Sequence, residues 1–451
     1  MFFSFLTHYS KNKIIKNICL GLCFFFILGT YTLLKELKDA VFIITVGTAY
    51  LPDAKLISLL VMIPMVLFYT WLSERLSRHK LLSVYALFFS VGSFIISYFL
   101  KDPEIGLLNT APSYYRLFGW ITYLFLEGCS PFLVSLNWSF LNSISKPTDV
   151  KNNYILMTAM GKIGSFFFAL FAWVLLSRNF SFLKKIADID IYVYLFHASS
   201  YALIVVACIL FYLVYKLPKE EFEGYVDLNE TEVKEKKNEN IFSSGFSLFF
   251  RNSYVLGIVG MIFCWEIVNV VFNNLRLSIA YKEAETIADL SLLLFKSTIT
   301  TNLISLLFVV IGTNSLIRFL GKRTALLLIP LLTGSIMISF LFHQTAAMVI
   351  FTYTVIRAIN LSLTTPLRES LYIPTSKEIQ FKTKSWIDSF GQKFSKGCGS
   401  FYNKCIQFIP LYIAYYVQIG FFLIVISFWT YIAYFLGKKW KNAISEKKII
   451  K

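Results

Sequence analysis

Apolar segments long enough to cross a lipid bilayer recur along almost the whole chain. Hydrophobic residues make up 57% of the 451 residues and charged residues only 15%, whereas a soluble domain has about 25% charged residues. A membrane-spanning helix needs about 20 apolar residues, so a chain of this length has room for about twelve spans. The sequence therefore predicts an all-α polytopic membrane protein.

The apolar segments place these spans along the chain with short loops between them. We expect spans at residues 17–46, 52–73, 81–100, 116–141, 154–177, 193–215, 252–275, 289–312, 325–343, 348–372, 385–409 and 411–436. The first segment is too long for one straight span, so we expect a break near Leu34–Lys38. Because no small-residue cleavage site precedes that point, we interpret the N-terminal residues as a short tail entering the first span, not as a removed signal peptide.

The basic residues of the chain indicate its orientation in the membrane. A net charge of +17 would suggest a nucleic-acid partner in a soluble protein. Here the Lys and Arg residues gather in loops on one predicted side, so we interpret them as topology signals and expect no nucleic-acid partner. The bias predicts cytoplasmic N- and C-termini. No organellar transit peptide is predicted, which favours a bacterial plasma membrane.

One long hydrophilic segment, residues 216–250, separates the expected spans into two halves of about six each. The predicted domains are an N-terminal half, 1–215, this cytoplasmic linker, and a C-terminal half, 251–451. Short basic loops at Ser73–Lys80 and Leu316–Arg323 occupy equivalent places in the halves. They suggest parallel repeats, as in major-facilitator transporters, although positive-inside anchoring alone also places basic residues there.

Charged side chains inside the expected spans are the first candidates for function. A charge at the bilayer centre costs roughly 2.5–3.5 kcal/mol, so such residues usually mark a ligand or ion path. In the first span, Lys35 and Asp39 are expected to pair at i,i+4, with Lys38 close to the same face. The alternative is a collar of side chains that reach to the interface at a span end.

The fourth and fifth expected spans each contain one charge. Glu127 has no basic neighbour in sequence, so its partner must come from another span or from a substrate, unless it is a hydrogen-bonded structural carboxyl. Pro131 would let the helix bend beside it. Lys162 lies between Gly161 and Gly164, which permit close helix approach. The alternative is that Lys162 reaches the nearby membrane surface.

The tenth expected span and two earlier ones contain further charges. Glu266 and Lys296, in the seventh and eighth spans, could pair with each other. Arg357, Arg368 and Glu369 recur at spacings near a multiple of a helical turn, so we expect them to line one face of the tenth span.

The eleventh expected span is the most polar. It contains Asp388, Lys393 and Lys396, followed by Gly397 and Gly399. Small residues beside a lysine would let backbone amides approach an anionic group, as phosphate sites require.

No motif indicates an enzyme, a cofactor or a metal centre. The sequence contains neither a Walker loop nor a dinucleotide fingerprint in a suitable context, nor HExxH or GxSxG. Its four histidines are isolated, and its seven cysteines show no CxxC spacing. We therefore expect no metal, no cofactor and no disulfide framework.

Several ordered motifs resemble the ATP/ADP translocase family, nucleotide transporters of plastids and intracellular bacteria. They are LKELKDAVFIIT, YLFLEGCSPFLVSLNWSF and PLRESLYIPTSKEIQFKTKSWIDSFGQKFSKGCGS. The likeness covers nearly the whole chain and is strongest in residues 31–145 and 364–400. The resemblance implies substrate-binding roles at Lys38, Asp39, Glu127, Arg368, Glu369, Asp388 and Lys396.

The chain departs from the family pattern at two places. Asn269 stands where the family has a seventh-span glutamate, and Glu266, three residues upstream, could substitute for it. Lys162 is an added positive charge. Both changes make the expected binding cavity more positive, which would suit a more anionic nucleotide or a different counter-ion. With Lys35 and Lys393, these residues form a secondary set of candidates.

The resemblance implies a secondary transporter that exchanges nucleotides, ATP and ADP foremost, by alternating access. Its cations would replace the hydration of the phosphates, and its carboxylates would hold those cations in place. Exchange needs no ATPase site, because opposing gradients drive it. The alternatives are proton-coupled uptake of a nucleotide or another organic anion, with Glu127 as the proton carrier, and a transport-inactive membrane scaffold. The expected partners are a nucleotide and the lipid bilayer.

Overall fold

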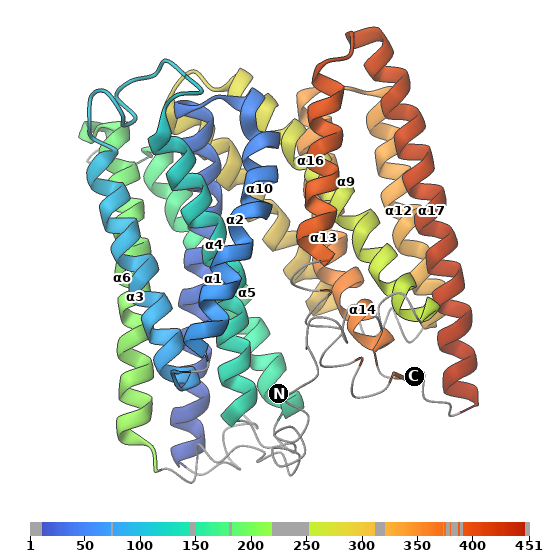
Figure 1. Cartoon of the computed structure of the whole chain (residues 1–451), viewed down its shortest axis with the longest axis horizontal. Helices are drawn as coiled ribbons and strands as arrows, with labels where there is room; N and C mark the ends of the chain where they lie inside the picture. Colours follow the sequence, from blue (N-terminus) through green and yellow to red (C-terminus); the bar gives the residue numbers. More distant parts are fainter. Residues whose placement is uncertain are drawn as a thin grey trace. The chain divides into compact units, whose positions relative to one another are not determined.

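Every regular element in the described part of the chain is a helix (Figure 1). The computed structural model describes residues 11–73, 75–144, 150–179, 183–218, 252–311, 321–372, 374–375, 379, 387 and 391–446. Within these residues, 11 helices are long and apolar enough to cross a membrane. The prediction of an all-α polytopic membrane protein is confirmed.

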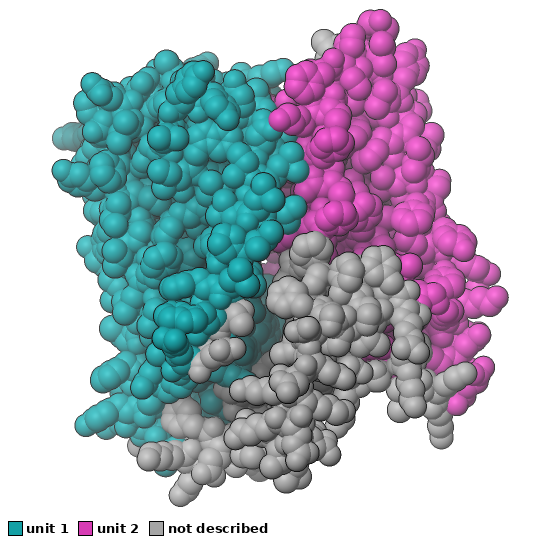
Figure 2. Space-filling model, viewed as in Figure 1, with its two compact units in different colours: residues 1–232, 280–299 teal, residues 233–279, 300–451 magenta. Residues whose placement is uncertain are grey.

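The chain divides into two compact units (Figure 2). Unit 1 contains residues 1–232 and 280–299, and unit 2 contains residues 233–279 and 300–451. Unit 1 therefore includes residues 280–288, which follow the seventh predicted span, and the first part of the eighth predicted span. The sequence-based domains 1–215 and 251–451, with the linker between them, stay a prediction.

The first six long helices all belong to unit 1. They are α1 (Lys11–Thr45), α2 (Leu51–Ser73), α3 (Arg78–Phe99), α4 (Leu117–Ile144), α5 (Val150–Ser177) and α6 (Asp188–Lys216). Two short 3-10 turns, Thr48–Tyr50 and Leu183–Lys185, precede α2 and α6.

The expected break in the first span is wrong, because α1 is one continuous helix of 35 residues. At about 1.5 Å per residue it is roughly 52 Å long, well beyond the hydrocarbon thickness of about 30 Å. A helix of this length accommodates the bilayer by tilting and by extending past the hydrocarbon. Lys35 and Lys38 therefore lie on regular helix, and their side chains have fixed angular positions around α1.

Close helix packing positions α1 within unit 1, where it contacts α4, α5 and α6. A Cβ atom added at Gly164 would clash with the backbone carbonyl of Phe25, and one at Gly161 would clash with Leu28. On the α1 side, Gly29 faces the ring of Phe168 in the same way. The prediction that Gly161 and Gly164 permit close approach is confirmed, and such small-residue contacts are how helices pack in lipid.

The remaining helices lie wholly or partly in unit 2, and α9 and α10 are divided between the units. They are α9 (Ser253–Glu283), α10 (Ile287–Ile311), α12 (Lys322–Phe342), α13 (Ala346–Ile359), the π-helix Asn360–Thr364, α14 (Thr365–Leu371), α16 (Gln392–Gln407) and α17 (Leu411–Ser445). The core of the unit forms around α9, where Phe272 packs against Phe340 of α12 and Phe422 of α17. Trp429 is fully buried in the same cluster.

The tenth predicted span contains an irregularity that the sequence did not reveal. Residues 346–371 form one candidate span, but a π-helical segment, Asn360–Thr364, separates α13 from α14. A π-helix has wider turns than an α-helix, so it rotates everything after it relative to everything before it. The expectation that Arg357, Arg368 and Glu369 share one face assumed an unbroken α-helix and is corrected by this segment.

Candidate functional site

Lys38 is the centre of a buried charge cluster in unit 1. Its ammonium donates a hydrogen bond to the carboxylate of Glu127 and lies 3.5 Å from Oδ1 of Asp39. It also lies 4.3 Å from the centroid of the Tyr123 ring. We call Lys38, Asp39, Tyr123 and Glu127 the Lys38 cluster. The sequence predicted a partner for Glu127 from another span or from a substrate, and the structure shows the first of these, because Lys38 is on α1 and Glu127 on α4.

The local sequence explains how α4 presents this face. Tyr123 and Glu127 are four residues apart, so both side chains lie on one side of the helix. α1 packs directly on α4, and the two α4 side chains therefore meet the same lysine. Pro131 has no N–H, so the helical hydrogen bond to the Glu127 carbonyl cannot form there. The proline thus makes α4 locally more deformable beside the carboxylate.

The Lys38 cluster contains one cation and two carboxylates, which differ in exposure. The side chains of Lys38 and Asp39 are 7% and 3% exposed, whereas that of Glu127 is 21% exposed. Oδ1 of Asp39 is buried and has no hydrogen-bond partner in the part of the chain that the structure describes. Such a buried pair is hard to break, since removing one member strands the other, at about 3–5 kcal/mol. A competing anion, however, can replace one carboxylate beside Lys38, because the lysine then still has an anionic partner.

A second ion pair lies one turn earlier on α1. Lys35 pairs with Glu36 at 2.8 Å, and Thr298 of α10 donates a hydrogen bond of 2.9 Å to the same carboxylate. The expected Lys35–Asp39 pair is therefore corrected: Lys35 binds Glu36, and Asp39 lies against Lys38. Glu36, which is 1% exposed, was not among the residues predicted from the sequence. Its position between two lysines inside an apolar run was the available signal.

Unit 2 contains a corresponding buried cation that sequence analysis also missed. Arg276 of α9 is 1% exposed. It donates a 3.0 Å hydrogen bond to Asn273, and its guanidinium lies 4.4 Å from the centroid of the Tyr353 ring. Arg357 donates to the hydroxyl of the same tyrosine. We call Asn273, Arg276, Tyr353 and Arg357 the Arg276 cluster. Arg276 was missed because the predicted span ended at residue 275, whereas α9 continues to Glu283.

Glu266 and Asn269 are in contact on α9. The amide of Asn269 lies 3.4 Å from Oε2 of Glu266, and Glu266 is buried. The carboxylate that could replace the seventh-span glutamate is therefore adjacent to the residue occupying that position. Lys296 falls in unit 1, and its pairing with Glu266 stays a prediction.

The other predicted residues differ in how far they are buried. Arg368 lies 3.8 Å from Glu369, whose side chain is 43% exposed. Lys162 on α5 is half-buried, as are Lys393 and Lys396 on α16. Asp388 lies outside the described residues. The roles of all these residues stay predictions.

The expected phosphate cradle at Gly399 is corrected by the packing of α16. A Cβ atom there would lie 3.1 Å from Val270 and 3.2 Å from the backbone of Ile267. The glycine therefore allows α16 to contact α9 and does not expose its amide to a ligand. Gly399 lies inside a regular helix, where backbone N–H groups bond within the helix.

The fold of the chain is that of known transporters. A D-xylose–proton symporter has a TM-score of 0.66 at 15% identity, covering 94% of this chain and 97% of the symporter. A bacterial homologue of the iron transporter ferroportin also has a TM-score of 0.66, at 9% identity, covering 94% of this chain and 100% of that protein. At such low identity the likeness shows the fold alone, which is of the major-facilitator type.

Sequence comparison identifies a family. The chain is 24% identical over 460 residues to ADP,ATP carrier protein 3 of Rickettsia felis, covering 90% of this chain and 89% of that protein. It is also 24% identical to ADP,ATP carrier protein 1 of Chlamydia trachomatis, covering 88% and 83% of the two chains. The family model of the TLC ATP/ADP transporters matches residues 2–109 and 114–440. The chain therefore belongs to the TLC ATP/ADP transporter family.

Proposed function

We propose that this protein is a secondary transporter that exchanges nucleotides such as ATP and ADP, and that the Lys38 cluster binds their phosphates. The observation that carries the proposal is the Lys38–Glu127 ion pair, which joins α1 and α4 within the residues that the family model matches. Relatives named ADP,ATP carrier proteins support the substrate class.

The proposed chemistry is an exchange of anions on one lysine. A phosphate oxygen would take the position of the Glu127 carboxylate and receive the same charge-assisted hydrogen bond. A lysine is suited to this because its ammonium is a compact point charge that accepts several geometries. When the phosphate leaves, Glu127 would pair with Lys38 again, so the buried cation would always face an anion.

The Arg276 cluster is the proposed second binding region for negative charge. A guanidinium presents a planar fork that suits phosphate oxygens, and the cluster contains two of them around Tyr353. In the same proposal Arg368, Lys396 and Lys393 supply further positive charge, and Asp388 and Glu369 orient these cations. Glu266 acts in place of the glutamate that the family has at Asn269.

The remaining parts of the proposal concern the setting of the protein. We place it in a bacterial plasma membrane with both termini in the cytoplasm, as the positive-inside bias indicates. We propose no catalytic activity and no cofactor, since opposing nucleotide gradients can drive the exchange.

The experiment is uptake of labelled ATP by intact bacterial cells that express the full chain, with internal ADP varied. We expect saturable uptake that rises with internal ADP and is abolished by Lys38→Ala and by Glu127→Ala. Lys101→Ala is the matched control, because this lysine follows the end of α3, pairs with Asp190 in the first turn of α6 and is 57% exposed. Absence of saturable uptake, or equal uptake by all three variants, would contradict the proposal. Uptake that a protonophore abolishes and internal ADP leaves unchanged would favour proton coupling instead.

A further inference from the structure

Five basic side chains gather where α12 begins and α17 nears its end. The two helices lie side by side within unit 2 (Figure 1). Two of the residues open α12 and three lie close to the end of α17: Lys322, Arg323, Lys438, Lys439 and Lys441. We call these five residues the α12–α17 basic surface.

The α12–α17 basic surface lies at the depth of the lipid headgroups. Residues 324–342 of α12 and 411–437 of α17 contain no charged residue. At about 1.5 Å per residue these stretches are roughly 28 Å and 40 Å long, and the hydrocarbon core of a bilayer is about 30 Å thick. The five cations therefore lie where each helix leaves the hydrocarbon, at the level of the lipid phosphates.

Aromatic rings hold two of these cations in place. The Lys322 ammonium lies 4.5 Å from the centroid of the Trp440 ring, and the Arg323 guanidinium lies 5.1 Å from that of Tyr434. Arg323 also packs against Gly437, where an added Cβ atom would lie 2.9 Å from its side chain. Because these contacts already restrict the long side chains, less conformational entropy is lost when they bind a ligand.

The positive charge of the surface is in excess. Within the described residues no carboxylate forms an ion pair with any of the five cations. Lys439 donates a 2.6 Å hydrogen bond to the Ser253 hydroxyl, which does not neutralise its charge. The first turn of α12 contains no acidic residue, although a helix start favours an anion and not the two cations found there. A bound anion would therefore compensate these charges.

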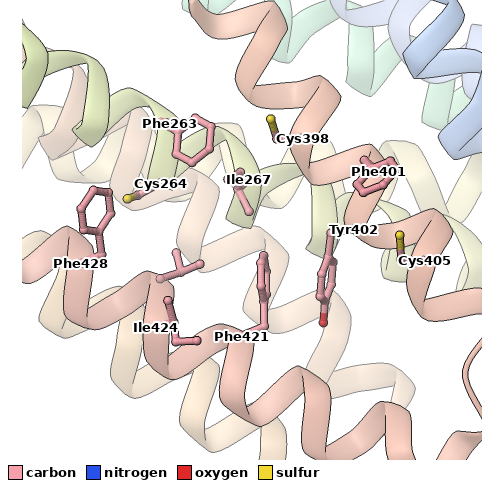
Figure 3. A pocket seen from close by; sticks show the side chains of 11 residues that line it. Phe263, Cys264, Ile267, Cys398, Phe401, Tyr402, Cys405, Phe421, Ile424 and Phe428 are labelled. Atoms are coloured by element: carbon pink, nitrogen blue, oxygen red, sulfur yellow. The ribbon is translucent and has the colours of Figure 1, made fainter.

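The exposed side of α17 leads directly to the cations. Ile424, Tyr431 and Lys438 are spaced seven residues apart, so they lie along one side of the helix. All three are exposed, Ile424 and Tyr431 by 70% and 66%. Ile424 also borders the apolar cavity between α9, α16 and α17 (Figure 3). An apolar side that ends at a lysine fits a ligand with an acyl chain and an anionic head.

Two further cations lie next to Lys438. Lys441 is three residues later on the same side of α17 and is exposed. Tyr434 is four residues earlier, and the Arg323 guanidinium of α12 lies over its ring. Arg323, Lys438 and Lys441 therefore surround one position at the end of the apolar side.

We propose that the α12–α17 basic surface binds the headgroup of an anionic phospholipid. The lipid phosphate lies between Arg323, Lys438 and Lys441, and one acyl chain runs along the side of α17 that carries Ile424. An arginine offers a fork for two phosphate oxygens, and lysines add point charges. Basic residues between helix ends at a membrane surface bind anionic headgroups in this way.

The charge of the surface selects among phospholipids. A zwitterionic headgroup would bring its own cation against five others, whereas a headgroup with a net negative charge would not. The proposal goes beyond nucleotide exchange, and none of its residues belongs to the Lys38 or Arg276 clusters. Its test measures bound lipid and not uptake, so it can fail while the proposed function holds.

The test is native mass spectrometry of the full chain in detergent, titrated with phosphatidylglycerol or with phosphatidylcholine of the same acyl chains. We expect phosphatidylglycerol to bind saturably and more tightly than phosphatidylcholine. Lys438→Gln, Lys441→Gln should weaken phosphatidylglycerol binding about 25-fold, at about 1 kcal/mol or fivefold for each cation. Phosphatidylcholine binding should not change. Equal affinity of the unmodified chain for both lipids would overturn the proposal.

The matched control removes two lysines elsewhere. Lys184 and Lys185 are exposed and lie in the short 3-10 helix Leu183–Lys185 of unit 1. Lys184→Gln, Lys185→Gln changes the net charge by the same amount and should leave the affinity for phosphatidylglycerol unaltered. An equal loss in both double variants would show that net charge alone attracts the lipid, which would refute a site at α12 and α17.

The role of Arg323 is tested with two variants. Arg323→Gln should weaken phosphatidylglycerol binding about fivefold, and Arg323→Lys, which keeps the charge, should retain most of the affinity. Gel filtration in detergent shows whether Arg323→Gln folds, since this side chain packs on Gly437. If it does not fold, the variant of the two exposed lysines decides the question alone.

A competition experiment separates a lipid from a soluble phosphate. Millimolar ATP should leave the bound phosphatidylglycerol in place, because the acyl chain holds the lipid against α17. Displacement of the lipid in proportion to the ATP concentration would show that the surface takes soluble phosphates, and would contradict the proposal.

Discussion

The two units bury a cation against a tyrosine in much the same way, but they surround it differently. In unit 1 the Lys38 ammonium lies 4.3 Å from the Tyr123 ring, and in unit 2 the Arg276 guanidinium lies 4.4 Å from the Tyr353 ring. Lys38 pairs with the carboxylates of Glu127 and Asp39. Arg276 donates to the amide of Asn273 and shares its tyrosine with a second arginine.

This difference separates two ways of holding a positive charge in a membrane. An ion pair gives the lysine an anion that another anion can replace. In unit 2 an amide and an aromatic face hold the guanidinium through a hydrogen bond and a cation–π contact. We therefore expect the Lys38 cluster to respond to substrate by exchange of partners, and the Arg276 cluster by direct attraction.

The largest effect is expected from removing Lys38. Lys38→Ala leaves Glu127 and Asp39 buried without their cation, which should lower the free energy of unfolding by about 3–5 kcal/mol. Thermal unfolding in detergent measures this. The triple variant Lys38→Met, Asp39→Asn, Glu127→Gln removes all the charges and should regain most of the stability without any uptake. A triple variant as unstable as Lys38→Ala would show that the ion pair is not the reason for the loss.

A smaller effect is expected from Arg276→Ala. It removes a charged hydrogen bond and a desolvated cation–π contact, together about 2–4 kcal/mol. Arg276→Lys keeps the charge but loses the planar guanidinium. We therefore expect a free energy of unfolding between those of the unmodified chain and Arg276→Ala, and weaker nucleotide uptake than in the unmodified chain. Thermal unfolding and nucleotide uptake are measured on both Arg276 variants and compared with the same measurements on Lys38→Ala. Full uptake by Arg276→Ala would exclude the Arg276 cluster from substrate binding.

The next effect concerns Glu266 and Asn269. Asn269→Glu alone places two carboxylates one turn apart on α9 and should reduce uptake about three- to tenfold through like-charge repulsion. The exchange variant Glu266→Asn, Asn269→Glu moves the single carboxylate to the family position and should restore uptake. Competition by ATP, ADP, GTP and UTP measures any change in preference. If the exchange variant is as defective as Asn269→Glu alone, Glu266 does not substitute for the family glutamate.

The smallest effect is expected in the loop between α3 and α4. Asp190 raises the pKa of Lys101, and the N–H groups of Ile105 and Glu104 lower the pKa of Asp102. The Lys101–Asp190 interaction stabilises the folded state below the ordinary Lys101 pKa of 10.5, and this stabilisation is lost as the pH rises above that value. The hydrogen bonds to Asp102 stabilise the folded state above its ordinary pKa of 3.8, and this stabilisation is lost as the pH falls below that value. Between about pH 5 and 9 neither contribution changes. Lys101→Ala should therefore leave the pH profile of uptake unaltered in this window.

The sequence predicted the helices well because bilayer thickness sets their length. Span 2 was expected at 52–73, and α2 covers Leu51–Ser73. It also predicted that Glu127 needs a partner from another span or from a substrate, since a buried carboxylate without one is costly. The identity of that partner was not predictable, because it depends on how α1 packs against α4 in the tertiary structure.

The failures have physical causes as well. The predicted span ended before Arg276 because a charge normally marks the end of a hydrophobic run. The cation–π contact with Tyr353 of α13, which helps to bury Arg276, depends on tertiary structure. The π-helical segment after Ile359 depends on packing, and it separated Arg357 from Arg368. Gly399 followed a lysine as a phosphate-site glycine would, but α9 fills the space beside it.

The central claim, that nucleotide phosphate replaces Glu127 on Lys38, is tested most directly by binding of ADP to the purified protein. Isothermal calorimetry on Glu127→Gln should give a lower Kd than the unmodified chain, by about tenfold, because the competing carboxylate is gone. Lys38→Gln should bind no ADP, while the control Lys101→Ala should bind it unchanged. Weaker binding by Glu127→Gln, together with full binding by Lys38→Gln, would contradict the account.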